Sequence, residues 1–512
     1  MIIGNTQDNE CLKYISMRKQ ILLLMLVCIT AVPAIAQQDE KNEMQLLQTE
    51  FNQYKHQITD EFNSNRDKLN KEFADYMKKE WEAFRSFQGI PVPKQPDPVT
   101  PPVKKRPDEK LDNHQIPQGN VVPLPEPQTQ PQPVAPIPVA PMPEKSQTLD
   151  FTFYGIPCSV SWNESLKYTL SSLKGEVLSD AWNQLSDKKY NAFLTDCIAL
   201  RSRLSLCDWG YLELLQQITQ SIFGSAKANE SVLLQMYVLC QTGYKTRLAQ
   251  SEETKLSLLI CTNIDMYNRT YIDIDGAKYY VIGSDAKSFN VLTVGFPNEQ
   301  SFSLQINGEQ LATGTETAPK IFHSRAYPTE SVSTGVNSRT INFYNSYPQC
   351  DWKIYAMTPL SSTIKKNVYP ILEKAIRGKS EAEAANMLIN FVQTAFEYKT
   401  DEEQFGYERT FFPDELFYYP YSDCEDRAVL YATLVRDLLH LNVVLLHYPN
   451  HLATAVHFNQ DVTGNYLMVQ GTKYLVCDPT YIGAPIGDVM PQFKNTEAEV
   501  ILLSKTGKID KP

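Results

Sequence analysis

The spacing of apolar residues predicts one long amphipathic helix near the N-terminal end of the chain, over residues 39–88. The segment that contains it spans residues 37–90. Apolar and aromatic side chains recur there mostly in steps of three, four or seven, with charged residues between them. So narrow a stripe is not buried by the helix itself and requires a partner: a second copy in a coiled coil, another protein, or the rest of this chain. The stripe consists of Phe51, Tyr54, Ile58, Phe62, Leu69, Phe73, Tyr76, Phe84 and Phe87.

A proline-rich segment follows, over residues 91–146. Seventeen of the 32 prolines lie between Pro91 and Pro143, in runs such as "PLPEPQTQPQPVAPIPVAPMPEK". Such a sequence favours an extended polyproline conformation, which builds no core and, at ~3.1 Å per residue, reaches over ~100 Å. We therefore expect a disordered spacer between the N-terminal helix and a globular body. Recognition of the segment as a ligand by another domain is the alternative.

The remaining chain divides into three segments by its hydrophobic period. Residues 147–250 alternate helical patterns with polar breaks, whereas residues 251–357 show period two and are rich in β-branched and aromatic residues. Within the second segment, Asp275-Gly276 is a typical two-residue hairpin turn. Residues 358–512 contain two helices, then a third helix followed by several strands. The fold class predicted by this order is α+β.

The first 36 residues have the pattern of a signal peptide. A short basic start precedes the mostly apolar run Ile21–Val32, and Ala34-Ile35-Ala36 is a small-residue cleavage site. Cys28 lacks the small preceding residues that a lipidation site normally has. No later stretch reaches the ~20 apolar residues of a transmembrane helix. We therefore expect export to the periplasm or cell envelope, without a membrane span in the mature chain.

Charge and cysteine content narrow the function classes further. A formal charge of −11, a pI near 5.3 and the lack of a basic block argue against a nucleic-acid partner. Cleavage after Ala36 leaves eight cysteines, and an even number in an exported chain makes disulfides the ordinary expectation. Because their spacing is irregular, the pattern is also compatible with one free, reactive thiol.

Cys424 lies at a predicted helix start, within the stretch "YYPYSDCEDR". Ser422 and Glu425 fit a capping box, which places Cys424 in the first turn. Unpaired backbone N–H groups and the helix dipole lower the pKa of a thiol there, but Asp423 and Glu425 oppose this effect, so a histidine partner is required. A buried structural cysteine, or a disulfide with Cys477, is the alternative.

The strands after this helix supply the other two groups of a catalytic triad. His451 opens a strand after the turn Pro449-Asn450, and Asp478 closes a later strand before a proline. Cysteine at a helix start, histidine at a strand start and aspartate at a strand end are a nucleophile, a base and a base-orienting group for acyl transfer.

The stretches "YSDCEDRAVLYATLVRDLLHLNVVLLHYPNHLATAVHF" and "KYLVCDPTY" resemble the transglutaminase-like cysteine enzymes, particularly bacterial members. That family shows D-C-E-D or a near relative before a helix, a histidine opening a strand, and D-P-T or E-T-T closing another. The resemblance covers roughly residues 380–490. It departs from the family where Ser422-Asp423 replaces a Gly-containing lead-in.

The resemblance implies a role for each residue that matches. Cys424 is the nucleophile, His451 the general base and then acid, and Asp478 the residue that orients His451. The backbone N–H of Cys424 forms one arm of an oxyanion hole, and Tyr419 or Tyr421 is the candidate for the second donor. The implied architecture is a helix carrying the cysteine, packed on an antiparallel sheet.

Strand order conflicts with this assignment if each strand pairs with the next one in sequence. His457, rather than His451, would then lie at the same end of the sheet as Asp478. We follow the resemblance and expect His447 and His457 to be packed strand residues.

No cofactor or metal is expected from the sequence. Glu425 and Asp426 form an acidic pair, but no histidine spacing accompanies it, and a capping or solvated role is expected. Arg427 is expected to pair with a nearby acid.

These observations predict an exported cysteine hydrolase or acyltransferase that acts on peptide or amide bonds through a thioester. Its partners would be a protein or peptide substrate, with an envelope protein or self-association through the 39–88 helix. A non-catalytic envelope binding or scaffolding protein that keeps the same fold is the alternative. The substrate, and the choice between hydrolysis and transamidation, lie beyond the sequence.

Overall fold

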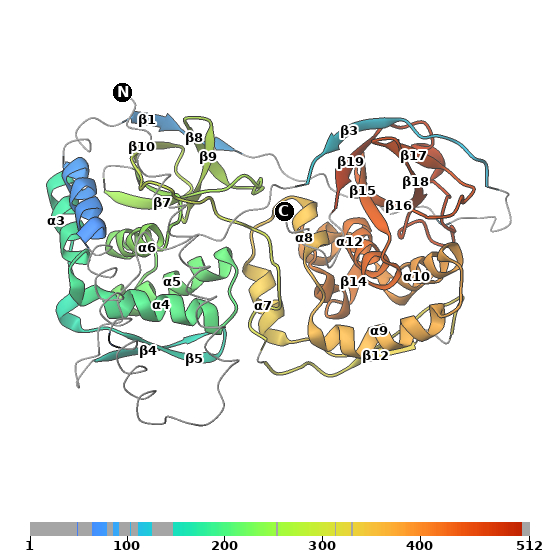
Figure 1. Ribbon diagram of the computed structural model, residues 1–512, viewed down its shortest axis with the longest axis horizontal. Coiled ribbons are helices and arrows are strands. Elements are labelled where there is room, and N and C mark those ends of the chain that lie inside the picture. Colours follow the sequence, from blue (N-terminus) through green and yellow to red (C-terminus); the bar gives the residue numbers. More distant parts are fainter. Residues whose placement is uncertain are drawn as a thin grey trace, which may run out of the picture. The chain divides into compact units, whose positions relative to one another are not determined.

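The computed structural model describes residues 64–78, 85–91, 111–124, 147–251, 254–312, 314–328 and 331–503, together with Thr49 and Val103. These residues form a mixed α+β structure whose sheets are mainly antiparallel (Figure 1). The expected fold class is therefore confirmed. The signal peptide, residues 39–48 and 50–63 of the expected N-terminal helix, and most of the proline-rich segment lie outside the described residues.

A seven-stranded antiparallel sheet is formed by the earlier part of the described chain, in the order β1-β10-β6-β7-β9-β8-β2. Helix α6 packs on β6 and β7, and α5 packs on α6. The strands are β1 (Arg85–Gln88), β2 (Ile90–Pro91), β6 (Thr246–Ser251), β7 (Lys255–Cys261), β8 (Thr270–Ile274), β9 (Ala277–Ile282) and β10 (Ser288–Leu292). The helices are α3 (Gly175–Leu185), α4 (Asn191–Arg203), α5 (Asp208–Phe223) and α6 (Asn229–Gln241), with the 3-10 turns η1 (Glu164–Leu166) and η2 (Lys188–Tyr190).

The helical segment and the β-rich segment share one core in this structure. Strand β6 comes from the segment predicted to be helical, yet it pairs with β7 and β10 of the β-rich segment. Between β8 and β9, Ile274 pairs with Ala277, and Asp275 and Gly276 both have positive φ, of 53° and 82°. This is the predicted two-residue hairpin, because a primed turn requires positive φ at both central residues.

Residues 65–78, from the described part of the N-terminal helix, pack on the helices and strands of the seven-stranded sheet. Phe73 is buried, with its ring 4.5 Å from that of Trp182 and 4.9 Å from that of Phe296. The partner of this part of the apolar stripe is therefore the chain itself. The prediction of one helix to residue 88 is wrong at its end, because Arg85–Gln88 is strand β1 and its backbone pairs with the outer edge of β10.

Several smaller elements connect the two main sheets in sequence. The hairpin β4–β5 packs on α4 and α5, and β11 pairs with β12. Their bounds are β4 (Thr148–Phe153), β5 (Ile156–Ser161), β11 (Lys320–His323), β12 (Ser331–Thr334), α7 (Ser338–Ser346) and α8 (Trp352–Met357).

The C-terminal part contains a six-stranded sheet in the order β17-β18-β16-β15-β19-β3. Helix α12 packs on β15 and β16 and also contacts α8 and α10 (Figure 1). The strands are β3 (Gln118–Val122), β15 (Asn442–Tyr448), β16 (His451–His457), β17 (Tyr466–Val469), β18 (Thr472–Cys477) and β19 (Ala498–Leu502). The helices are α9 (Ser362–Ile376), α10 (Glu381–Ala395), α11 (Asp401–Phe405) and α12 (Cys424–Leu434), and the short elements are β13 (Glu397–Tyr398), η3 (Pro413–Phe417), β14 (Tyr421–Ser422), the π-helical η4 (Val435–Leu439) and η5 (Pro491–Phe493).

One part of the proline-rich segment belongs to this sheet. Strand β3 pairs in parallel with β19, and the preceding Ile116 is buried while its backbone N–H donates to the carbonyl of Tyr466 at 2.8 Å. The expectation of a structureless spacer is therefore wrong at this point. The physical reason is local: Gln118–Val122 contains no proline, so its backbone N–H groups are available to a sheet.

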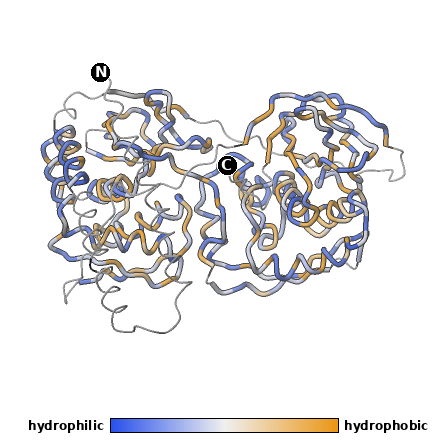
Figure 2. Tube along the Cα trace, viewed as in Figure 1, coloured by the Kyte–Doolittle hydropathy of each residue, from blue (hydrophilic) through white to orange (hydrophobic). Residues whose placement is uncertain are grey.

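Burial follows the hydropathy pattern closely in the C-terminal part. Hydrophobic residues are concentrated in its interior elements, β15 among them, where five of seven residues are buried apolar ones (Figure 2). Among the described helices, none combines the length and apolar character needed to cross a bilayer.

Candidate active site

Sheet topology brings the start of β16 and the end of β18 to the same edge. Strand β18 pairs directly and antiparallel with β16, through Thr454 and Cys477, while β17 pairs with β18 on its outer side. The assumption that each strand pairs with the next one in sequence is therefore wrong. His451 and Asp478 consequently lie together, and His457 lies at the opposite end, where its Nδ1 is 3.0 Å from the carbonyl oxygen of Lys473.

His451 and Asp478 form a buried hydrogen-bonded pair. Nε2 of His451 donates to Oδ2 of Asp478 at 2.8 Å, and both side chains are almost fully buried. Oδ1 of Asp478 accepts the backbone N–H groups of Thr480 and Tyr481 at 2.9 and 3.3 Å, which fixes the carboxylate. The imidazole ring stacks on Phe493, with the centroids 5.2 Å apart. This arrangement leaves Nδ1 as the ring nitrogen for proton exchange.

Cys424 is the first residue of α12, and its thiol lies against the start of β16. The backbone N–H of Leu452, the residue after His451, donates to the thiol sulfur, whereas the S–H group donates to Oε2 of Glu425 at 3.1 Å. Burial raises the pKa of the Cys424 thiol well above its ordinary value, and the charges of Glu425 and Asp423 raise it further. The thiol is therefore protonated and enclosed in this conformation, with 1% of its surface exposed.

The helix start differs by one residue from the predicted capping box. Asp423, not Ser422, is the N-cap residue, and its backbone N–H donates to Oδ2 of Asp426 at 3.2 Å. Oδ1 of Asp426 accepts the N–H of Phe411 at 2.8 Å. Asp426 is therefore a structural cap, as expected, but it serves a different N-cap residue.

The other sequence candidates have surroundings of their own. The hydroxyl of Tyr419 donates to Oδ1 of Asn345 at 2.7 Å, and Tyr421 is 37% exposed with Nζ of Lys399 over its ring. These contacts give neither tyrosine a link to the thiol. Tyr398 was missed: burial raises the pKa of its hydroxyl, and the charges of Cys424, Asp423 and Glu425 raise it further, so this ring lies near the thiol.

The structure also gives the contacts of Arg427, of the eight cysteines and of His447. Arg427 is fully buried, and its Nη2 and Nη1 groups donate to the backbone carbonyls of Phe396 and Gln393 at 2.7 and 3.3 Å. Within the described residues, it forms no ion pair with an acid. No disulfide links the eight cysteines after the signal peptide, all of which lie in described residues. The Cys424–Cys477 disulfide, which was the alternative to a reactive Cys424, is among those not formed. Of the histidines expected to be packed strand residues, His447 has its Nδ1 3.1 Å from Glu499.

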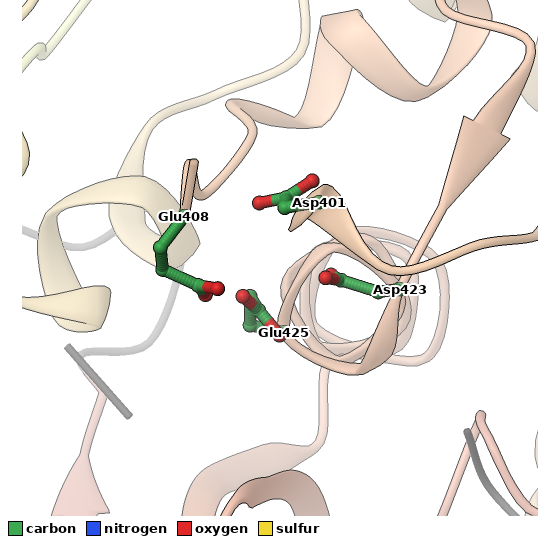
Figure 3. A group of neighbouring side chains, drawn as sticks. All are labelled: Asp401, Glu408, Asp423 and Glu425. Atoms are coloured by element: carbon green, nitrogen blue, oxygen red, sulfur yellow. The ribbon is translucent and has the colours of Figure 1, made fainter. Parts of the chain in front are cut away.

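Four carboxylates gather beside Cys424, and the sequence did not reveal this cluster. Asp401 begins α11, Glu408 lies in the loop after it, and Asp423 and Glu425 flank the cysteine (Figure 3). One oxygen from each lies within 4.8 Å of the others, and all four residues are buried. The residues are separated by up to 24 positions in the sequence with no regular spacing, so only the fold unites them.

Several oxygens of this acid cluster have no hydrogen-bond partner among the described residues. Both oxygens of Asp423 are buried and unpartnered, as are Oε1 of Glu408 and Oε1 of Glu425. Burial and the neighbouring acids raise the pKa of Asp401 to about 10, and burial with the adjacent Glu425 raises that of Glu408 to about 11. Such groups are costly unless they are protonated or bound to a cation.

The donor set of the acid cluster is the one that a hard divalent cation prefers. It consists of carboxylate oxygens alone, without histidine or thiolate ligands, and Ca²⁺ takes six to eight such oxygens in irregular geometry. The unpartnered oxygens of Asp423 point into the cluster and provide an observation independent of the grouping itself. The residues present therefore fit Ca²⁺ better than Zn²⁺.

Comparisons of the chain with models of known protein families, with curated proteins and with solved structures found no match.

Proposed function

We propose that this protein is a cysteine hydrolase or acyltransferase that acts on peptide or amide bonds. Cys424 is the nucleophile, His451 the general base and then acid, and Asp478 the group that orients His451. The observation that carries the proposal is the 2.8 Å hydrogen bond from Nε2 of His451 to Asp478, formed next to the helix start that holds the thiol. It rests also on the resemblance of these motifs to the transglutaminase-like enzymes.

The reaction proceeds through a thioester. Nδ1 of His451 takes the proton of the Cys424 thiol, and the sulfur attacks the carbonyl carbon of the substrate. The backbone N–H of Cys424 donates to the oxyanion at the positive end of α12. His451 returns its proton to the departing amine, and water or a second amine then releases the acyl group.

Turnover requires a change from the conformation described above. The S–H group points to Glu425 and must turn toward His451, and the enclosed site must open to admit a substrate. We further propose that the acid cluster binds a divalent cation such as Ca²⁺, which neutralises Asp423 and Glu425. These are the two neighbours that raise the pKa of Cys424.

The test is labelling of the full chain with a chloroacetamide probe at about pH 6 and about pH 8, with and without Ca²⁺. The full chain is needed because β3 is part of the sheet that holds His451. We expect modification of Cys424 in the folded protein, identified by peptide mapping, and its loss in Cys424→Ala. Cys477→Ala is the matched control, since Cys477 is equally buried.

Labelling that requires denaturation under every cation condition, or that persists at another cysteine in Cys424→Ala, would remove the enzyme proposal. The alternative is then a non-catalytic binding or scaffolding protein. The observation that favours this alternative is the enclosed, protonated thiol of Cys424. Export to the periplasm or envelope remains a prediction from the signal-peptide pattern.

A further inference from the structure

A cavity of about 340 Å³ lies between the helices and strands of the seven-stranded sheet. Its floor consists of the apolar side chains of Val232 on α6, Leu256 and Leu258 on β7, and Ile282 at the end of β9, all of them buried. This volume is at the lower end of the range for ligand sites, which is about 300–1,000 Å³. The space therefore suits a small ligand or one residue of a larger one.

A guanidinium group without an acidic partner lines this cavity. Arg269 lies over the ring of Trp209, with Cζ 5.2 Å from the ring centroid. Among the described residues, no hydrogen bond or ion pair to its guanidinium is formed, although burial disfavours its charge and lowers its pKa. The charge of Glu213 acts in the opposite direction and favours the charged guanidinium, but the two groups do not form an ion pair.

The side chains next to Arg269 are held in place by hydrogen bonds. Nε1 of Trp209 donates to Oε1 of Glu213 at 3.0 Å, and the hydroxyl of Tyr154 donates to Oε2 at 2.9 Å. Glu213 is thus occupied by other donors, and burial raises its pKa. The Trp209 ring is therefore held in one orientation, and the guanidinium of Arg269 lies over it and lines the cavity.

A second cation lies at the rim. The carbon chain of Lys227 passes over Gly283, with Cγ and Cε 3.6 Å from the position that a Cβ would take at that glycine. Its ammonium group forms no ion pair within the described part of the chain. Two cations over an apolar floor are complementary to an anion with an apolar body.

We propose that this cavity binds a small organic carboxylate, whose carboxylate group pairs with Arg269 and whose apolar body lies on the floor formed by Val232, Leu256, Leu258 and Ile282. A planar guanidinium matches a carboxylate through two parallel hydrogen bonds. The ligand is either a free small acid or the C-terminal residue of a peptide, since both present the same chemistry. The proposal is independent of the function assigned to Cys424.

The test is isothermal titration of the full chain with four probes: isocaproate, N-acetyl-alanyl-leucine, and the amide of each. We expect at least one acid to bind with a dissociation constant below about 10 mM, and its amide to bind at least about tenfold more weakly, because a charged hydrogen-bond pair is lost. Trp209 fluorescence should change on binding. Preference for the dipeptide identifies a peptide terminus, and preference for isocaproate identifies a free acid.

The variant Arg269→Gln should weaken binding of the acid by about tenfold or more, with a smaller loss in Lys227→Gln. Arg325→Gln is the matched control, because Arg325 is exposed and lies outside this cavity. Equal binding of acid and amide, absence of binding by all four probes, or unchanged affinity in a folded Arg269→Gln overturns the proposal. If Arg269→Gln does not fold, the comparison of acid with amide on the unmodified protein decides.

Discussion

The thiol of Cys424 has two competing sets of neighbours. On one side, Oε2 of Glu425 accepts a hydrogen bond from the S–H group, and Glu425 and Asp423 raise the pKa of the thiol when they are ionised. On the other side, the backbone N–H of Leu452 donates to the sulfur and lowers this pKa. The reactivity of this residue is therefore set by its neighbours, because the helix start alone does not offset burial and two acids.

Replacing Asp478 by Asn should slow alkylation of the Cys424 thiol by about a hundredfold or more, because a neutral amide neither fixes the His451 tautomer nor stabilises the imidazolium that forms with the thiolate. The rate of chloroacetamide labelling against pH measures this effect. Asp461→Asn is the control, since Asp461 is exposed and pairs with Nζ of Lys473 at 2.7 Å. An unchanged pH profile in a folded Asp478→Asn protein would contradict the assigned role.

Tyr398→Phe should lower the rate of acyl transfer by about tenfold to a hundredfold if this hydroxyl stabilises the oxyanion. Burial raises the pKa of this hydroxyl, and the charges of Cys424, Asp423 and Glu425 raise it further, so the ring lies near the thiol. Tyr421→Phe, which removes an exposed hydroxyl, is the comparison. Equal rates in the two variants would show that the second oxyanion donor lies elsewhere.

Pairing order among the strands decides which histidine belongs to the site. Because β17 is the edge strand and β18 is inserted next to β16, the end of β18 meets the start of β16. The edge on the opposite side is covered by β3, which belongs to the proline-rich segment. An unprotected edge invites pairing with other chains, and β3 removes that exposure from β19.

Ile116→Ala should reduce the free energy of unfolding by about 2–5 kcal/mol, because Ile116 is 1% exposed and anchors β3 in the core of the six-stranded sheet. Urea unfolding of the full chain measures the change. Leu124→Ala is the matched control, as Leu124 is 43% exposed at the other end of the same segment. Equal losses in the two variants would mean that β3 contributes little to the sheet.

The acid cluster links the folding of the C-terminal part to pH and to cations. Asp401 and Glu408 have folded-state pKa values of about 10 and about 11, against ordinary values of 3.8 and 4.5. The folded state therefore holds protons that the unfolded state releases, so stability falls as pH rises from about 4 toward about 10. A bound cation reverses this pH dependence of stability, because it stabilises the ionised carboxylates in the folded state.

In a chelator, the melting temperature should fall between about pH 5 and about pH 9, and Ca²⁺ should raise it by an amount that grows with pH. Thermal unfolding with and without Ca²⁺ measures both effects. Glu408→Gln should reduce the response to Ca²⁺, while Glu403→Gln, on the exposed side of α11, should keep it. A Ca²⁺ response that is absent, or equal in the two variants, would contradict cation binding by the cluster.

Local periodicity in the sequence was sufficient to predict the α+β class, helices α9, α10 and α12, and the hairpin turn at Asp275-Gly276. These features depend on residues a few positions apart, so propensity and pattern describe them directly. The motif order also singled out Cys424, His451 and Asp478 as candidates.

Only the tertiary structure decided how distant segments meet. It placed β3 in the six-stranded sheet, inserted β18 beside β16, and gathered Asp401 and Glu408 around the acids that flank Cys424. The physical reason is that strand pairing and buried charge clusters depend on contacts between residues far apart in the chain. Their energies come from burial and hydrogen bonding in the folded molecule, and no local spacing encodes them.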